Sequence, residues 1–327
     1  MPEQTLPDEA IITQAADRIS DQLGETPLLR VPDLEASLGQ PLWLKCENLQ
    51  RTGSFKARGA LNWLLTARDR ELEPGLVTVS AGNHAIALAW AASQRSVPLT
   101  VVMPEGSSAL KIERTRALGA EVVIHGAIGE AVAHCHRLRE RHGFTLVHPY
   151  NDPRIMAGQG TVGLELVRQQ PDIRRILCPI GGGGLISGVG LAIKARRPDI
   201  ELIGVEPAGA ATMANAWAHE DHTASLEKVV TWASSLAPAV VGDWTYAASR
   251  QVVDRLVTVS EDGIREATRR LLTEARLYVE PGAAVGLAAL LEGQVALDPE
   301  LPTALLITGG NLDLNQVALC QNGRQGH

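Results

Sequence analysis

The sequence predicts an α/β protein with two interlocked domains, each built on an open, mainly parallel sheet covered by helices. Short apolar runs of strand length alternate along the chain with longer segments of helical periodicity. Glycine-rich turns follow several of these runs, and no repeat of fixed period interrupts them. Such alternation is typical of parallel strands connected by helices that pack on both faces of a sheet.

Nine runs have the length and apolar character of buried strands. They are residues 41–46, 76–80, 99–103, 121–124, 145–147, 176–180, 201–205, 256–259 and 304–307. Helical patterns lie between them. In residues 261–275, Ile264 and Leu271 fall on one face and arginines on the other, and the pattern at 109–118 ends at Gly119, which can close a helix in the left-handed conformation. Ligands bind to such sheets where strands end and helices begin.

Composition limits the classes of partner. The 327 residues are 45% hydrophobic, enough for a large core, and the formal net charge is −7. This charge disfavours nucleic acid or an anionic membrane as the main partner. The four cysteines are far apart, so no disulfide framework or zinc motif is expected. No signal peptide and no membrane-spanning stretch is visible, and we expect a cytoplasmic protein.

A lysine follows a small-residue turn in the first candidate segment, residues 47–59. Thr52-Gly53-Ser54-Phe55-Lys56 connects an expected strand to an expected helix. A partly desolvated lysine at a helix start can lose its proton and act as a nucleophilic amine. An ordinary surface lysine in a strand–helix loop is the plain alternative.

The second segment, Ser80-Ala81-Gly82-Asn83-His84, follows the expected strand 76–80. A small-residue turn that opens a helix presents free N–H groups, which suit a carboxylate. Taken alone, His84 is more often a helix N-terminal residue without chemistry than a proton shuttle.

Two glycine-rich turns complete the set. The run Gly181-Gly182-Gly183-Gly184 lies between a strand and a helix, and several backbone N–H groups there can converge on a phosphate. A tight turn is the plain alternative, but it needs one or two glycines and not four. Thr308-Gly309-Gly310-Asn311 follows the last strand and is also an ordinary turn sequence.

In order and spacing, these four segments resemble the fold-type II pyridoxal-phosphate enzymes, which share a tryptophan synthase β-like fold. The similarity runs from about Gly24 to Asn311 and points to the threonine/serine dehydratase and serine racemase branch. The β-replacement branch typically has threonine where this chain has His84. The resemblance implies a large cofactor-binding domain of residues 1–74 and 148–327 and a small substrate-loop domain of residues 75–147.

The resemblance also implies roles for individual residues. Lys56 is expected to be the catalytic residue, bonding covalently to pyridoxal 5′-phosphate and moving the Cα proton. The cofactor is expected to be bound by Phe55, Lys56, Asn83, Gly181, Gly182, Gly183, Gly184, Leu185 and Thr308, with Thr308 facing the pyridine nitrogen. The substrate carboxylate is expected to be bound by Ser80, Ala81, Asn83 and His84. Glu206 is a candidate metal ligand, but Ala210 and Thr212 stand where metal-dependent relatives carry a second acid.

The implied reaction is α,β-elimination from L-threonine, and from L-serine, to a 2-oxoacid and ammonia, by a homodimer acting on a small amino acid. Alternatives within the branch are a dehydratase of another β-hydroxy amino acid, such as 3-hydroxyaspartate or a phenylserine-like compound, and a serine racemase. A distant alternative is a nicotinamide-dependent oxidoreductase, because Gly182-x-Gly184 followed by Glu206 imitates a dinucleotide fingerprint. Its third glycine is misplaced, and it leaves Lys56 unexplained.

Overall fold

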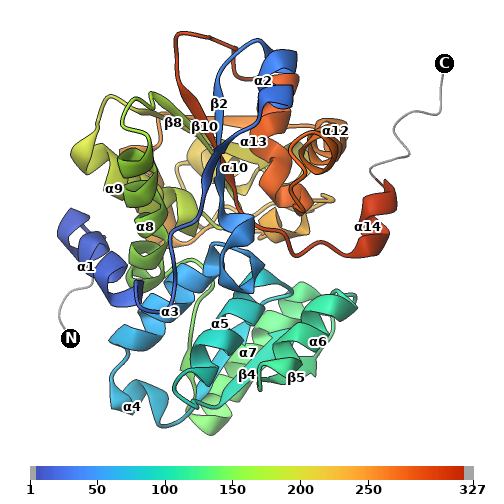
Figure 1. Ribbon diagram of the computed structural model, residues 1–327. Helices are drawn as coiled ribbons and strands as arrows, with labels where there is room; N and C mark the ends of the chain where they lie inside the picture. The colour runs from blue at the N-terminus through green and yellow to red at the C-terminus, as the bar shows by residue number, and fades with distance from the viewer. Residues whose placement is uncertain (1–4, 320–327) are drawn as a thin grey trace.

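The computed structural model describes residues 5–319 and contains two sheets (Figure 1). The larger sheet has the strand order β1-β2-β10-β7-β8-β9, with bounds Leu28–Arg30, Leu42–Cys46, Thr303–Ile307, Arg175–Pro179, Glu201–Pro207 and Arg255–Val259. The smaller sheet has the order β5-β4-β3-β6, with bounds Glu121–Ile124, Leu99–Met103, Leu76–Val79 and Thr145–Leu146. The predicted fold class, with two open sheets, is confirmed.

Helices cover both faces of the larger sheet. One face packs against α2, α12 and α13, which span Pro32–Leu38, Glu261–Thr273 and Pro281–Leu291. The other packs against α8, α9, α10 and α11, which span Pro153–Gln169, Gly184–Arg196, Thr212–His219 and Asp243–Val252. This two-sided cover explains why strands such as β7 and β10 are buried along their whole length and mostly apolar.

The smaller sheet is also covered on two sides. Helices α3 and α5, spanning Lys56–Thr66 and Asn83–Ser93, share one hydrophobic core with β3 and β4, while α7, spanning Ile128–His142, packs on the other face. Helix α6 spans Ala109–Ala117, and the remaining helices are α1, α4 and α14, at Glu9–Ile19, Asp69–Leu72 and Leu314–Leu319. Because α3 contacts both α5 and α8, it lies where the two units meet (Figure 1).

The predicted strands agree with the observed ones to within two residues, and Gly119 has the predicted left-handed conformation, with φ of +90°. One strand was missed. Strand β1 is three residues long and is the antiparallel edge of the larger sheet, so its periodicity is too short to be read. The smaller sheet lies within residues 76–146, inside the predicted small domain, whose bounds stay a prediction.

Within residues 5–319, none of the helices combines the length and apolar character that a bilayer crossing needs. Cys46, Cys135 and Cys178 are buried free thiols, and for Cys46 and Cys178 the apolar runs around them predict this. Cys320 lies outside the described residues.

Candidate active site

The loops that follow β2, β3, β7 and β10 gather at the carboxyl ends of the strands. Ser54, before α3, pairs with Gly309, after β10, in an isolated β-bridge. Beside this bridge, the backbone N–H of Phe55 donates to the carbonyl of Thr308 at 3.2 Å. The Asn311 amide donates to Oδ1 of Asn83 at 2.8 Å, which joins the loops after β10 and β3. The structure thus brings the predicted segments together, although they are far apart in the sequence.

Lys56 is the first residue of α3, and its amine lies at the centre of these loops. Its Nζ donates to the carbonyl oxygen of Pro149 at 2.7 Å and lies 5.2 Å from the centre of the Phe55 ring. Desolvation lowers the pKa of Lys56 to about 8, and the nearby Glu280 carboxylate opposes part of this shift. At neutral pH a larger fraction of this amine is therefore neutral than in an exposed lysine, and the neutral amine is the form that nucleophilic chemistry needs.

The four glycines connect the end of β7 to the start of α9. Gly183 caps α9 with φ of +88°, a conformation that side chains rarely adopt. A Cβ at Gly182 would lie 2.3 Å from the ring of Tyr150, and one at Gly184 would lie 2.9 Å from the Tyr150 Cβ. These positions are glycine because Tyr150 packs directly against the backbone and leaves no room for a side chain. The first amides of α9 lack intrahelical partners by geometry, and this arrangement suits a phosphate group.

The turn after β3 opens α5, which begins at Asn83. Ala81 is exposed, and the backbone N–H of Gly82 donates to the Ser80 hydroxyl at 3.2 Å. His84 is only 2% exposed, and burial together with the nearby Lys56 lowers its pKa well below the usual value. His84 is therefore neutral at neutral pH, and it can donate a hydrogen bond to an anion without carrying a charge.

Several buried polar atoms in these loops lack partners among the described residues. They include the hydroxyls of Thr52 and Ser54 and Oδ1 of Asn48. The His84 ring has the Val147 backbone beside it, but neither ring nitrogen makes a well-formed hydrogen bond. Buried polar groups are normally hydrogen-bonded, so unpaired ones in a cluster of loops indicate that a polar ligand completes the site. Together with the bare glycine turn and the desolvated amine, they fit a ligand that carries a phosphate and a carbonyl group.

Asn83 contacts a network of residues that were not among the predicted site residues. Its Nδ2 donates to Oε1 of Glu280 at 2.5 Å, and Glu280 also pairs with Lys111 through Oε2 at 3.4 Å. Arg114 of α6 donates to Oδ1 of Asn311. Glu280 carried a signal in the sequence, because the run Val279-Glu280-Pro281, at the start of α13, also resembles the dehydratase branch. Lys111 and Arg114 carried none, since they look like ordinary helix-surface cations.

Glu206, the candidate metal ligand, is fully buried at the end of β8. Its two carboxylate oxygens accept the backbone N–H groups of Met213 and Ala214, at 2.7 and 2.9 Å. The Thr212 hydroxyl donates to the Pro238 carbonyl at 2.7 Å. Across the described part of the chain, no cluster of three acidic, histidine or cysteine side chains is arranged to bind a metal. Here the carboxylate acts as a cap for α10.

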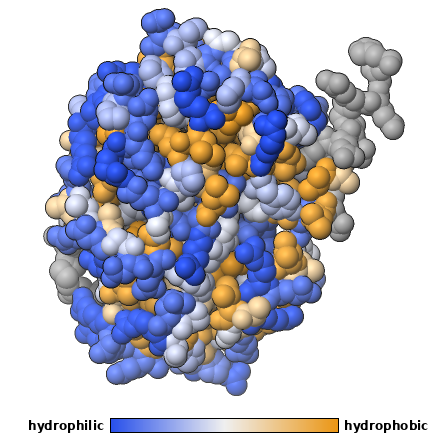
Figure 2. Space-filling view, in the orientation of Figure 1, coloured by the Kyte–Doolittle hydropathy of each residue, from blue (hydrophilic) through white to orange (hydrophobic). Residues whose placement is uncertain are grey.

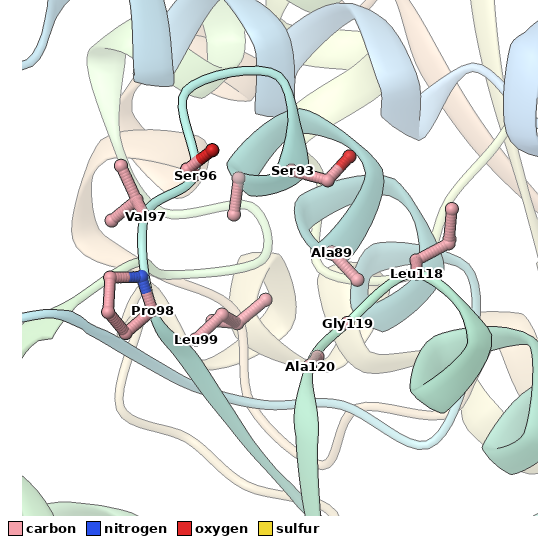
Figure 3. A pocket seen from close by; sticks show the side chains of 10 residues that line it. Ala89, Ser93, Ser96, Val97, Pro98, Leu99, Leu118, Gly119 and Ala120 are labelled. Carbon is pink, nitrogen blue, oxygen red and sulfur yellow. The ribbon is translucent and has the colours of Figure 1, made fainter.

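A pocket of about 310 Å³ lies elsewhere, at the amino ends of β4 and β5 (Figure 3). Its lining, which includes Ala89, Ser93, Pro98 and Gly119, contains no ionisable side chain. The pocket thus lies at the opposite end of the small sheet from Lys56 and offers no group for acid–base chemistry.

Comparisons with known proteins identify the family of this chain. A family model described as pyridoxal-phosphate dependent enzyme matches residues 19–309. An L-threonine ammonia-lyase of Geobacter sulfurreducens is 41% identical over 94% of this chain and 77% of its own length, and a catabolic L-threonine dehydratase of Escherichia coli K12 is 36% identical over 94% of both. A solved maize serine racemase superposes with a TM-score of 0.90 at 35% identity, covering 97% of both chains. Because the family model spans most of the sequence and these relatives match nearly all of it, the protein belongs to the pyridoxal-phosphate-dependent enzymes.

Proposed function

We propose that this enzyme is an ammonia-lyase that converts L-threonine, and L-serine, to a 2-oxoacid and ammonium. One observation carries the proposal. The desolvated Lys56 amine lies between a glycine turn that suits a phosphate group and a helix start that suits a carboxylate. The choice of substrate is supported by the Geobacter and Escherichia relatives, because both are named as enzymes that act on L-threonine. Because the chain belongs to the pyridoxal-phosphate-dependent enzymes, we discard the alternative of a nicotinamide-dependent oxidoreductase.

The residues of the site fit the cofactor. The proposed phosphate ligands are the backbone N–H groups of the glycine turn and of the residue that follows it: Gly181, Gly182, Gly183, Gly184 and Leu185. Phe55 would pack on the ring, Asn83 would bind its 3′-oxygen and Thr308 would face its nitrogen. When bound, the cofactor supplies an electron sink for the charge that develops at Cα.

The protein's own part in the reaction is to hold the substrate and move a proton. Ser80, Ala81, Asn83 and His84 would fix the carboxylate at the start of α5, where backbone N–H groups favour an anion. Lys56, hydrogen-bonded to the Pro149 carbonyl, would then take the Cα proton. The β-hydroxyl leaves as water, and the proton that it gains balances the one removed from Cα. Hydrolysis of the enamine product then gives the 2-oxoacid and ammonium.

The rate at which the apo-protein binds pyridoxal phosphate covalently should rise with pH, with a midpoint near pH 8. The reason is that the reactive form is the neutral amine, and the lowered pKa of Lys56 lets it lose its proton well below the usual 10.5. Rapid-mixing absorbance measurements across pH 6–10 would give the midpoint. Glu280→Gln should move this midpoint to lower pH, because the Glu280 carboxylate raises the pKa of Lys56. A midpoint near pH 10 would contradict the assignment.

Incubation with L-threonine should yield 2-oxobutanoate and ammonium, and L-serine should yield pyruvate. A doubly acidic substrate such as 3-hydroxyaspartate needs a spare cation near the site. Lys111 lies nearby but is paired with the Glu280 carboxylate, and Arg114 donates to the amide oxygen of Asn311, which engages the guanidinium without cancelling its charge. A substrate panel scored by 2-oxoacid and ammonium production tests this proposal. Strong preference for 3-hydroxyaspartate or a phenylserine-like compound, with threonine inert, would overturn it.

Serine racemisation is the second candidate, favoured by the similarity to the maize enzyme. Racemisation needs a second proton carrier on the face opposite Lys56, and Ala81, at the turn before α5, has no proton to give. Racemisation of L-serine should therefore be slow relative to elimination, and Ala81→Ser should raise it severalfold. Chiral chromatography of the product mixture measures both rates. Rapid formation of D-serine by the unmodified enzyme would refute the prediction.

We further propose that the enzyme acts in the cytoplasm as a homodimer. The three described cysteines are free thiols, as is usual in reducing compartments. Large apolar side chains remain exposed at Leu49, Tyr278 and Leu314, and hydrophobic residues gather near the centre of the face in Figure 2. Such surface suits burial by a second copy. Light scattering at micromolar concentration would test the dimer.

A further inference from the structure

The turn of residues 148–151, between β6 and α8, is built around the ring of His148. Its Nδ1 accepts two backbone N–H groups, from Asn151 at 2.9 Å and from Tyr150 at 3.3 Å. A ring nitrogen that accepts hydrogen bonds carries no proton, so the proton lies on Nε2. This is the arrangement that an asparagine or aspartate side chain makes in many tight turns.

The turn supplies two contacts to the active site. The Pro149 carbonyl accepts from the Lys56 amine at 2.7 Å. The next residue, Tyr150, packs its ring against Gly182 and its Cβ and backbone against Gly184, and its hydroxyl donates to the Val240 carbonyl at 2.9 Å. One turn therefore contacts both the reactive amine and the phosphate-type loop.

Both ends of the turn are fixed. On one side, the Val147 carbonyl accepts from the Thr78 hydroxyl at 2.8 Å, which ties the turn to β3. On the other, the Asn151 amide donates to Asp243 at 2.8 Å and accepts from the backbone of Trp244 at 3.0 Å, at the start of α11. With its ends held by both sheet units, the conformation in the middle depends on the His148 hydrogen bonds.

We propose that His148 is a positioning residue for the reaction: by shaping this turn, it fixes the carbonyl oxygen that orients the Lys56 amine. The inference rests on the proposed function in one respect, which is that Lys56 is the amine that reacts. A displacement of about 1 Å at a reacting group can cost about 10²-fold in rate, so a residue that sets the position of that amine matters even without touching substrate.

The charges around His148 keep its ring neutral. Burial, and then the Lys56 amine, lower its pKa to about 4. Four other titratable groups face it from neighbouring elements: His84 on α5, His136 on α7, Asp152 at the cap of α8 and Asp243 on α11. Across the pH range of activity, Nδ1 stays an acceptor, and the role is therefore geometric.

The test compares His148→Asn with His148→Leu. Asparagine keeps an acceptor at the same place, and Asn-Pro is a favoured turn sequence, while leucine is apolar and cannot accept. In the loaded enzyme, His148→Leu should lower kcat for the elimination about 10²-fold with KM within about threefold, and His148→Asn should stay within about threefold of the wild type.

A second readout needs neither cofactor nor activity. Competitive acetylation of the apo-protein at several pH values, read by peptide mass, gives the pKa of Lys56. The Pro149 carbonyl favours the charged amine, so His148→Leu should lower this pKa by about half a pH unit and His148→Asn should leave it unchanged. Thermal unfolding of each variant checks that it folds.

The proposal is overturned if His148→Leu keeps both the kcat and the Lys56 pKa of the wild type. It is also overturned if both variants lose activity and melting temperature equally, because the ring would then serve only to fill space. If the wild type shows no lyase activity, the proposed function fails, while the acetylation measurement still decides the role of His148.

Discussion

Lys56→Ala is expected to reduce ammonium release from L-threonine by at least about 10³-fold while the protein stays folded. A positioned general base contributes about 10²–10⁴-fold, and this variant loses the covalent attachment of the cofactor as well. The fold should survive, because the side chain starts α3 at the edge of the site and donates one hydrogen bond, to Pro149. Cofactor should still bind through the glycine turn at reduced affinity.

Borohydride reduction of the loaded wild type, followed by peptide mass mapping, should place the label on Lys56. Lys45 and Lys111 are suitable internal controls, because both are buried lysines with acidic partners. The Lys45 amine lies 2.6 Å from Glu165, and that of Lys111 lies 3.4 Å from Glu280. An ammonium held by a carboxylate is a poor nucleophile. Label on either of them, or turnover retained by Lys56→Ala, would show that the catalytic lysine had been assigned wrongly.

The sequence predicted the parts of the fold that depend on local pattern. The apolar runs predicted all the parallel strands of the larger sheet, because strands that are buried on both faces have nearly continuous apolar sequences. The glycine turn at 181–184 could be predicted because four successive glycines show that the backbone there carries no side chains. Strand β1 was missed, because three residues at a sheet edge carry too little pattern.

The rest of the site could not be predicted because its contacts join residues that are distant in the chain. Lys56 meets the carbonyl of Pro149, 93 positions away, and a carbonyl has no side-chain signature. Asn83 meets Glu280 across 197 positions. Neither contact follows from periodicity or a motif. Both arise because the loops after parallel strands converge at one edge, and the identity of each neighbour depends on the final packing.

A buried cluster of charges lies behind the lysine, and it was also invisible in the sequence. Arg58, two residues after Lys56, is 1% exposed and binds both oxygens of Glu47, at 2.8 and 2.9 Å. It also binds Glu165 of α8 at 2.5 Å, and Lys45 binds the same carboxylate at 2.6 Å. Burial disfavours the charged guanidinium, but Glu47 and Glu165 outweigh this and raise the pKa of Arg58. Two cations and two anions thus balance inside the protein, tying α3 to α8 and β2.

Arg58→Met should therefore destabilise the protein far more than the loss of a surface ion pair. Methionine has a similar volume, but it leaves Glu47 buried without a cation, and breaking a buried pair in this way costs about 3–5 kcal/mol. At about 2–4 °C per kcal/mol, the melting temperature should fall by roughly 10 °C.

Arg30→Met is the control for this variant, because it removes a surface ion pair with Glu35 in which the arginine is half exposed, and it should change the melting temperature little. Adding Glu47→Gln to Arg58→Met should recover part of the loss, since the neutral amide no longer needs a cation. Thermal unfolding of the three variants and the wild type measures each difference. If Arg58→Met had the same melting temperature as the wild type, the charge cluster would not stabilise the fold. Helix α3 would then hold Lys56 in place by its apolar packing alone.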